Sequence, residues 1–164
     1  MYPNAQVPAT ADLLDEHGDR AAVCLLPLRR FGGRAAFAGA ISTIRCFEDN
    51  VLLAQRVSEP GDGRVLVVDA AGSLRVAVLG ERLAGLALAN GWAGVVINGA
   101  VRDSAVLAGL DLGIRALGTC PRRSAKEGHG EFDVPVAFGE VTFEPGGLLS
   151  ADDDGIAVLS RVGA

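Results

Sequence analysis

The sequence predicts a mixed α/β domain in which strands outweigh helices. Two short runs, at residues 65–68 and 94–98, are almost wholly apolar, which is typical of strands covered on both faces of a sheet. A helical pattern over residues 80–90 lies between them and gives this region a β-α-β rhythm. Beyond residue 130 the pattern changes to short extended runs. With 164 residues, no internal repeat and no linker, the chain is expected to form one domain over residues 1–164.

The first half of the chain is expected to begin with a helix. Thr10 can cap a helix over residues 11–16, and Gly18 can end it. Residues 25–30 then run into a turn at 31–34. The next expected elements, in chain order, are a strand at 36–46, a helix at 48–57 with Glu48 and Asp49 at its positive end, a turn at 60–63 and a strand at 64–69.

The second half continues this alternation and then becomes all-β. The expected elements are an extended segment at 74–79, a helix at 80–90 ended by Gly91, a strand at 94–98, a brief helix at 104–110 and a strand at 113–119. A polar loop over residues 122–130 follows. The pattern at 134–143 is typical of a hairpin that turns at Gly139 and Glu140. Two further strands, at 148–149 and 156–159, flank an acidic turn at 152–155.

The overall charge and hydropathy exclude several classes of protein. A formal net charge of -5 and a pI near 5.0 argue against a direct nucleic-acid surface. No apolar run approaches the roughly 20 residues that a membrane span needs, and residues 1–5 lack the basic-then-apolar order of a secretory signal. A cytoplasmic protein is therefore expected. Its hydrophobic content of 49% and mean hydropathy of +0.32 favour some apolar surface buried between subunits.

The reactive side chains limit the chemistry further. Cys24, Cys46 and Cys120 are far apart and lie beside apolar residues, which favours structural thiols in a reducing compartment. With two histidines and no paired cysteines, the chain lacks the soft ligands of a zinc site, so any metal is expected to be a hard, oxygen-bound cation. The one lysine, Lys126, lies in a polar, glycine-bearing stretch. A Schiff-base mechanism needs a desolvated lysine and is not expected.

The first candidate binding feature is the stretch Gly80-Glu81-Arg82-Leu83. A helix that begins here points its free backbone N–H groups at whatever lies before it, and its dipole favours an anion such as a substrate carboxylate. Alternatively, Gly80 ends a strand and Glu81 merely stabilises its own helix. Taken alone, this stretch favours the alternative, because every helix has such an end.

The second candidate feature is the pair Arg102-Asp103, which follows an apolar run that ends at a glycine. Asp103 could supply one hard oxygen to Mg²⁺ or Mn²⁺, and Arg102 could neutralise an oxyanion or enolate beside the metal. Alternatively, Asp103 is the N-cap of the following short helix and Arg102 is an ordinary surface side chain. Composition alone favours neither interpretation.

Several stretches together resemble a known family. They are Phe31-Gly32-Gly33-Arg34 and residues 41–50, 65–72, 99–103, 111–114, 128–131 and 151–156. On these residues, from about residue 10 to residue 160, the chain resembles the regulator-of-ribonuclease-E-activity family, which shares its fold with 4-hydroxy-4-methyl-2-oxoglutarate aldolases. The resemblance implies a single-domain, three-layer swivelling β/β/α fold that assembles as a ring-shaped homotrimer with sites between subunits. Older labels on such sequences name a demethylmenaquinone methyltransferase, but this sequence has no adenosylmethionine-binding glycine motif.

In the aldolase branch of this fold, the signature is an acid after glycine, then twenty intervening residues, then Arg-Asp. Glu81, Arg102 and Asp103 match that spacing. The resemblance implies that Arg102 and Asp103 are catalytic: the backbone amides of residues 80–83 hold the pyruvoyl carboxylate, Arg102 binds the C2 oxygen and Asp103 binds the metal. Family members that act only as ribonuclease inhibitors can lack the aspartate, which this chain keeps.

Two functions are expected on these grounds. The first is a divalent-metal-dependent lyase that cleaves 4-hydroxy-4-methyl-2-oxoglutarate to pyruvate, or decarboxylates oxaloacetate, through a metal-bound pyruvate enolate. Many aldolase members carry an acid a few positions after Arg-Asp, where this chain has Ala105 and Val106, which leaves the ordering of the metal's waters open. The alternative is a protein-binding regulator that masks a ribonuclease of the RNase E type or a helicase. The acidic charge suits contact with a basic protein.

Overall fold

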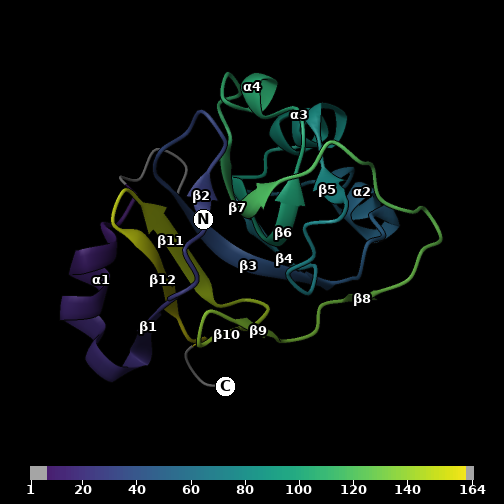
Figure 1. Cartoon of the computed structure of the whole chain (residues 1–164). Coiled ribbons are helices and arrows are strands. Elements are labelled where there is room, and N and C mark those ends of the chain that lie inside the picture. Colours follow the sequence, from purple (N-terminus) through teal and green to yellow (C-terminus); the bar gives the residue numbers. More distant parts are fainter. Residues whose placement is uncertain (1–6, 162–164) are drawn as a thin grey trace.

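The computed structural model describes residues 7–161, and Figure 1 shows a large sheet with helices against it. The helices are α1 (Thr10–His17), the 3-10 turn η1 (Gly18–Arg20), α2 (Val51–Val57), α3 (Glu81–Ala89) and α4 (Ser104–Leu107). The strands are β1 (Ala21–Val23), β2 (Arg29–Arg30), β3 (Phe37–Arg45), β4 (Val65–Asp69), β5 (Ala77–Leu79), β6 (Gly94–Val101), β7 (Gly113–Thr119), β8 (Glu131–Phe132), β9 (Val136–Phe138), β10 (Val141–Phe143), β11 (Leu148–Asp152) and β12 (Gly155–Leu159). Within residues 7–161, no helix has the length and apolar character that crossing a bilayer requires. Residues 1–5, where no secretory signal was expected, lie outside the described range.

The large sheet has a parallel centre and antiparallel margins. Its strand order is β1-β12-β11-β3-β4-β6-β7-β2, with β5 paired to β6 and β8 to β3. Strands β3, β4, β6 and β7 run parallel, whereas β1, β12, β11 and β2 pair in antiparallel fashion. A separate hairpin of β9 and β10 turns at Gly139 and Glu140, both with positive φ. The β-α-β rhythm and the hairpin expected from the sequence are therefore confirmed.

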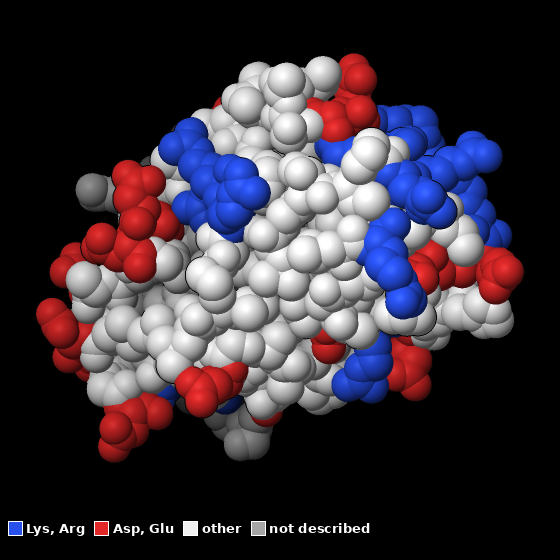
Figure 2. Space-filling model, viewed as in Figure 1, with Lys and Arg blue, Asp and Glu red and all other residues white. Residues whose placement is uncertain are grey.

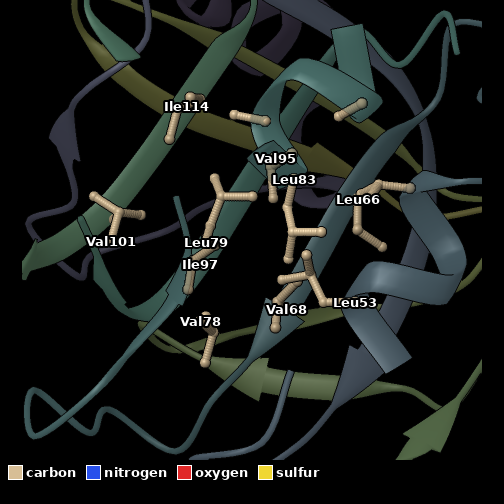
Figure 3. Packing of buried hydrophobic residues seen from close by; sticks show 14 of the residues in the cluster. Leu53, Leu66, Val68, Val78, Leu79, Leu83, Val95, Ile97, Val101 and Ile114 are labelled. Carbon is tan, nitrogen blue, oxygen red and sulfur yellow. The ribbon is translucent and has the colours of Figure 1, made fainter. Parts of the chain in front are cut away.

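One hydrophobic core lies between the parallel strands and the helices α2 and α3. Leu53 from α2 and Leu83 from α3 pack with Val68 and Ile97 of the sheet (Figure 3). These four side chains are 4% exposed or less. Burial of a side chain of this size contributes about 1.5–3 kcal/mol. The start of α3, which carries the first candidate feature, is thus fixed by packing against the sheet.

A second core lies on the opposite face of the sheet. The β9–β10 hairpin and strands β11 and β12 cover this face, where Phe138 and Phe143 stack with ring centroids 4.5 Å apart. Phe37 of β3 is 1% exposed here, and a Cβ at Gly94 or Gly113 would collide with its ring. The molecule is therefore layered as helices, parallel strands and further β-structure, which confirms a mixed α/β single domain with a large sheet.

Two helix starts differ from the sequence-based expectation, and polar side chains explain both. Thr10 is the first residue of α1 rather than its cap, because its N–H and Oγ1 both bind the Asp152 carboxylate at 2.8 Å. Helix α2 begins at Val51 rather than at Glu48. Glu48 has a left-handed backbone, with φ of +52°, and its carboxylate accepts a hydrogen bond from Arg75 at 2.6 Å. A helix cannot pass through such a residue.

Strand lengths differ from the expectation in a way that matters for the site. β5 covers only the last three residues of the extended segment at 74–79, and β6 continues beyond residue 98 to Val101. The longer β6 places Arg102 directly at the end of a strand, beside the end of β5. The short strands β1 and β8 were not expected, because segments of two or three residues carry no readable period.

The buried carboxylate of Asp49 holds the polar loop that follows β7. Its Oδ2 accepts the backbone N–H groups of Glu127 at 2.8 Å, Gly128 at 2.9 Å and His129 at 3.4 Å, while Oδ1 accepts that of Val51 at 3.0 Å. Burial raises the pKa of Asp49, but these four donors outweigh burial and hold the pKa below its usual value. The loop and the start of α2 are therefore joined through one ionised side chain.

We expect Gly113→Ala to lower the free energy of unfolding by about 1–3 kcal/mol, because the added methyl group would collide with the ring of Phe37. Gly85→Ala is the matched control, since a methyl group there meets open space on α3. It is expected to raise the free energy of unfolding by about 0.5–1 kcal/mol. Urea unfolding followed by circular dichroism measures both values. Equal changes at the two positions would contradict the close contact of β7 with Phe37.

We expect Asp49→Asn to lower the free energy of unfolding at neutral pH by about 1.5–3 kcal/mol, because hydrogen bonds to a charged acceptor are lost. A carboxyl whose folded-state pKa is depressed stabilises the fold above its unfolded pKa and loses this contribution as the pH falls through the folded pKa. The gap between wild type and variant should therefore shrink below about pH 4. Asp19→Asn, on the exposed turn η1, is the control. Urea titrations across this range in which the gap stayed constant would refute the role of Asp49.

Candidate active site

A cavity of about 470 Å³ opens where β5 and β6 end and α3 begins. Because β5 and β6 are parallel, with Leu79 opposite Val101, the chain leaves both strands at the same edge of the sheet. Open α/β sheets place their ligand groups at the carboxyl ends of parallel strands. The cavity wall includes all the predicted site residues, which are Gly80, Glu81, Arg82, Leu83, Arg102 and Asp103, together with Asn50, Arg123 and Lys126.

The side chain of Asp103 caps α3 rather than its own helix. Asp103 precedes α4 with a left-handed backbone, φ +60°, and makes no side-chain bond to that helix. Its Oδ2 instead accepts the N–H of Glu81 at 2.9 Å, at the positive end of α3. The two candidate features, separated by about twenty residues in the sequence, therefore form a single site.

Gly80 allows these groups to approach one another. A Cβ at this position would lie 2.9 Å from Oδ2 of Asp103, and 3.2 Å and 3.3 Å from Cγ and Nε of Arg102. The half-buried Arg102 lines the cavity, and its guanidinium has no acceptor within residues 7–161, since its recorded bond runs from the backbone N–H to Leu79. The guanidinium is therefore available to an anionic ligand.

The first turn of α3 supplies further donors to the cavity. The Glu81 N–H is occupied by Asp103, whereas the N–H groups of Arg82 and Leu83 have no acceptor in the described part of the chain. The side chain of Leu83 is 4% exposed and belongs to the core, so only its backbone is available to a ligand. Two unpaired amides at a helix N-terminus suit one carboxylate.

The cavity lining also includes residues that the sequence did not single out as site residues. Asn50, at the start of α2, donates from Nδ2 to the carbonyl of Val78 at 3.3 Å. Arg123 and Lys126 come from the loop that Asp49 holds. Lys126 is exposed, as its polar surroundings indicated. No local sequence pattern identified these residues, because the segment before α2 and the loop that it contacts are more than 70 residues apart in the sequence.

Cationic side chains outnumber carboxylates around the cavity. The cations are Arg82, Arg102, Arg123 and Lys126, and the carboxylates are Glu81 and Asp103. Figure 2 shows many of the basic side chains on the side of the molecule where Figure 1 places α3 and β5, with some acidic ones among them, and acidic side chains along the side of α1. The protein is acidic overall, yet this cavity suits a ligand with more than one negative charge.

The cavity fits a weakly held hard cation. No group of three or more His, Cys, Asp or Glu side chains in the described residues is arranged to bind a metal. Asp103 nevertheless lines the cavity with one carboxylate oxygen, Oδ1, that accepts no hydrogen bond from residues 7–161. Mg²⁺ is typically bound through one or two carboxylates, with water and substrate completing the coordination. The donor set present here matches that requirement.

The cysteines take no part in the cavity. Cys24 and Cys46 are buried, Cys120 is half-buried, and all three are free thiols. Burial, followed by the nearby charges of Asp49 and Asp69, raises the pKa of Cys46 to about 12. A thiol with this pKa is protonated at neutral pH and is a poor nucleophile. This agrees with structural rather than catalytic cysteines.

Comparison with known proteins places this chain in a family. The family model described as RraA-like, Aldolase/RraA, matches residues 10–158. A Geobacillus kaustophilus structure described as an S-adenosylmethionine:2-dimethylmenaquinone methyltransferase is 47% identical with a TM-score of 0.92, over 94% of this chain and 96% of that one. The RNA-processing inhibitor RraA from Thermus thermophilus is 45% identical with a TM-score of 0.91, over 97% and 99% of the two chains.

A more distant relative has the same fold. Streptomyces coelicolor RraAS2, described as an unusual member of the RNase ES inhibitor RraA protein family, is 31% identical with a TM-score of 0.73, over 95% of this chain and 82% of that one. The named functions of these relatives thus include ribonuclease inhibition and methyl transfer, while the family model also names aldolases. The chain belongs to the RraA-like family.

Proposed function

We propose that this protein is a divalent-metal-dependent carbon–carbon lyase that releases pyruvate from a short 2-oxo acid with a second carboxylate. The observation that carries the proposal is the meeting of three groups around Gly80 in one cavity. These groups are the free guanidinium of Arg102, the carboxylate of Asp103 and the unpaired amides of α3. The substrates that suit the site are 4-hydroxy-4-methyl-2-oxoglutarate and oxaloacetate.

The chain's own groups account for binding and for charge stabilisation. The N–H groups of Arg82 and Leu83 hold the C1 carboxylate at the N-terminus of α3. Arg102 donates to the C2 oxygen. Cleavage of the C3–C4 bond leaves its electron pair on C3, conjugated with C2 as the enolate of pyruvate, and the C2 oxygen then carries the negative charge. C4 departs as carbon dioxide from oxaloacetate, or as the carbonyl carbon of a second pyruvate from 4-hydroxy-4-methyl-2-oxoglutarate after water has taken its hydroxyl proton. Arg102 stabilises that charge until C3 is protonated.

Asp103 is the residue that would hold the cation. Its Oδ2 remains on the Glu81 N–H, which fixes the carboxylate and leaves Oδ1 directed to a ligand. When bound, Mg²⁺ or Mn²⁺ supplies Lewis-acid polarisation of the C2 carbonyl. The surplus of cations supports a substrate with a second carboxylate, because Arg123 and Lys126 also line the cavity.

We also propose that the protein assembles as a homotrimer. Its charges are unevenly distributed: α1 carries exposed Asp12, Asp15 and Glu16, while the cavity at α3 is lined by more cations than carboxylates. Oppositely charged sides favour head-to-tail contacts, which close into a ring when the rotation between subunits allows it. Exposed apolar side chains, including Phe47 and Leu74, provide surface that such contacts can bury.

Relatives described as ribonuclease inhibitors, at 45% and 31% identity, favour a second candidate function. We propose as this alternative that the protein binds a ribonuclease of the RNase E type, or an associated helicase, and masks it. The acidic side around α1 suits contact with a basic protein surface rather than with RNA itself. Such binding would use a face of the molecule away from the cavity.

We expect Mg²⁺-dependent release of pyruvate from both substrates, and a decrease in kcat/KM of about 10²–10³ for Asp103→Asn, because the cation loses its charged ligand. The amide oxygen of asparagine can still accept the Glu81 N–H, so the fold should be kept. Asp62→Asn, in an exposed turn, is the control. A lactate-dehydrogenase-coupled assay with Mg²⁺ and with EDTA measures the rates. Turnover indifferent to EDTA and to Asp103→Asn would rule the lyase mechanism out.

For the alternative function, we expect a purified RNase E-type enzyme to co-elute with this protein and to cleave RNA several-fold more slowly in its presence. Arg102→Gln separates the two functions, because it removes a donor from the cavity and leaves the acidic side intact. Light scattering during elution gives the masses of the complex and of the free protein. Normal cleavage and separate elution, combined with lyase turnover, would reject the regulator.

A further inference from the structure

A second cavity, of about 460 Å³, lies at the other end of the fold from the candidate active site. It is bounded by the segment that joins β1 to β2 and by the acidic turn between β11 and β12. Apolar side chains, among them Leu26, Leu28 and Ile156, form much of its wall. The charged residues that line it are Arg30, Arg115, Asp152, Asp153 and Asp154. Figure 2 shows the corresponding basic patch over β2 beside an acidic one over the β11–β12 turn.

Arg115 of β7 is the unusual group in this wall. The residue is 5% exposed. Its Nη2 donates to the carbonyl of Ala35 at 2.8 Å and to that of Asp152 at 3.1 Å. Its Nη1 is buried and has no hydrogen-bond acceptor within residues 7–161. A buried donor without a partner is destabilising, so this position calls for an acceptor.

None of the carboxylates near Arg115 accepts a hydrogen bond from its Nη1. The Asp152 carboxylate accepts hydrogen bonds from the N–H and Oγ1 of Thr10 and from the N–H of Asp154, and none from Arg115. Asp153 and Asp154 are exposed at the rim, and neither forms an ion pair with Arg115. Burial, followed by the charge of Arg30, lowers the pKa of Arg115. The nearby charges of Asp153 and Asp152 act in the opposite direction, but the guanidinium forms no ion pair with either residue.

Arg30 adds a second cation beside the first. Its Nε and Nη2 donate to the carbonyls of Gly32 at 3.1 Å and Gly33 at 2.8 Å, which fixes the guanidinium. Its Nη1 has no recorded acceptor in the described residues. Because β2 pairs with β7 and places Arg30 opposite Arg115, the two arginines lie on neighbouring strands. Two arginines on adjacent strands, above an apolar wall, are suited to one carboxylate.

We propose that this second cavity binds a small molecule with one carboxylate on an apolar body. The carboxylate binds Nη1 of Arg30, together with the guanidinium of Arg115, which lines the cavity beside it. The apolar body lies against Leu26, Leu28 and Ile156. Asp153 and Asp154 at the rim repel a second negative charge, so the cavity selects monocarboxylates. This preference is opposite to that of the cationic cavity at α3, and the proposal does not depend on the lyase function.

Isothermal titration calorimetry with three probes of similar size tests the proposal. The probes are 4-methylpentanoate, the dicarboxylate glutarate and the amine 3-methylbutylamine. We expect 4-methylpentanoate to bind about tenfold more tightly than glutarate, and the amine to give no binding heat. Arg115→Gln should weaken 4-methylpentanoate by about tenfold, because a charge-assisted bond is lost.

Two further variants keep the test decisive if Arg115→Gln fails to fold. Arg30→Gln, at an exposed position, should weaken 4-methylpentanoate several-fold, whereas the neighbouring Arg29→Gln, which does not line the cavity, should leave affinity unchanged. Arg102→Gln should also leave it unchanged, because Arg102 belongs to the other cavity. The proposal is overturned if millimolar 4-methylpentanoate gives no heat, if folded Arg115→Gln and Arg30→Gln bind it as wild type does, or if Arg102→Gln abolishes binding.

Discussion

The bond from the Glu81 N–H to the carboxylate of Asp103 ties the start of one helix to the end of a neighbouring strand. It is possible because β5 and β6 are parallel and end together, and because Gly80 has no side chain to separate them. The same contact orients the carboxylate, neutralises one amide of α3 and leaves the next two amides free. Anion binding by α3 and cation binding by Asp103 both depend on this junction. It also orients the second carboxylate oxygen of Asp103.

Local signals in the sequence marked both halves of this junction as candidates, and only the resemblance to the aldolase signature paired them. A glycine before a helical pattern marked residues 80–83, and an apolar strand marked Arg102 and Asp103. The β-α-β rhythm of the middle of the chain was likewise readable from alternating apolar and helical runs. The sequence did not reveal Asn50, Arg123 and Lys126, since their side of the cavity is assembled by contacts between distant segments. It also misplaced the start of α2, where a left-handed glutamate overrides helical periodicity.

The two cavities of this fold use arginine in different ways. At α3, cations surround an open, polar space, where long side chains can adjust to a ligand with several charges. At β7, Arg115 is held by two carbonyl groups and stacks 5.7 Å from the centre of the Phe37 ring, so its position is set by the core. The cavity at α3 therefore selects a ligand by its charge more than by its shape. The cavity at Arg115 favours one ligand group in one orientation, because the Arg115 side chain has little freedom to move.

The way in which Asp49 holds the loop affects how readily the ligand specificity of the cavity at α3 can change. The carboxylate secures the loop after β7 through backbone N–H groups, which every residue except proline possesses. The path of the loop is therefore insensitive to which side chains it bears. Substitutions at positions 123 and 126 can alter the lining of the cavity without disturbing the strands or the junction of Asp103 with α3. Recognition and scaffold are therefore carried by different atoms of the loop: side chains line the cavity, and backbone groups hold the loop in place.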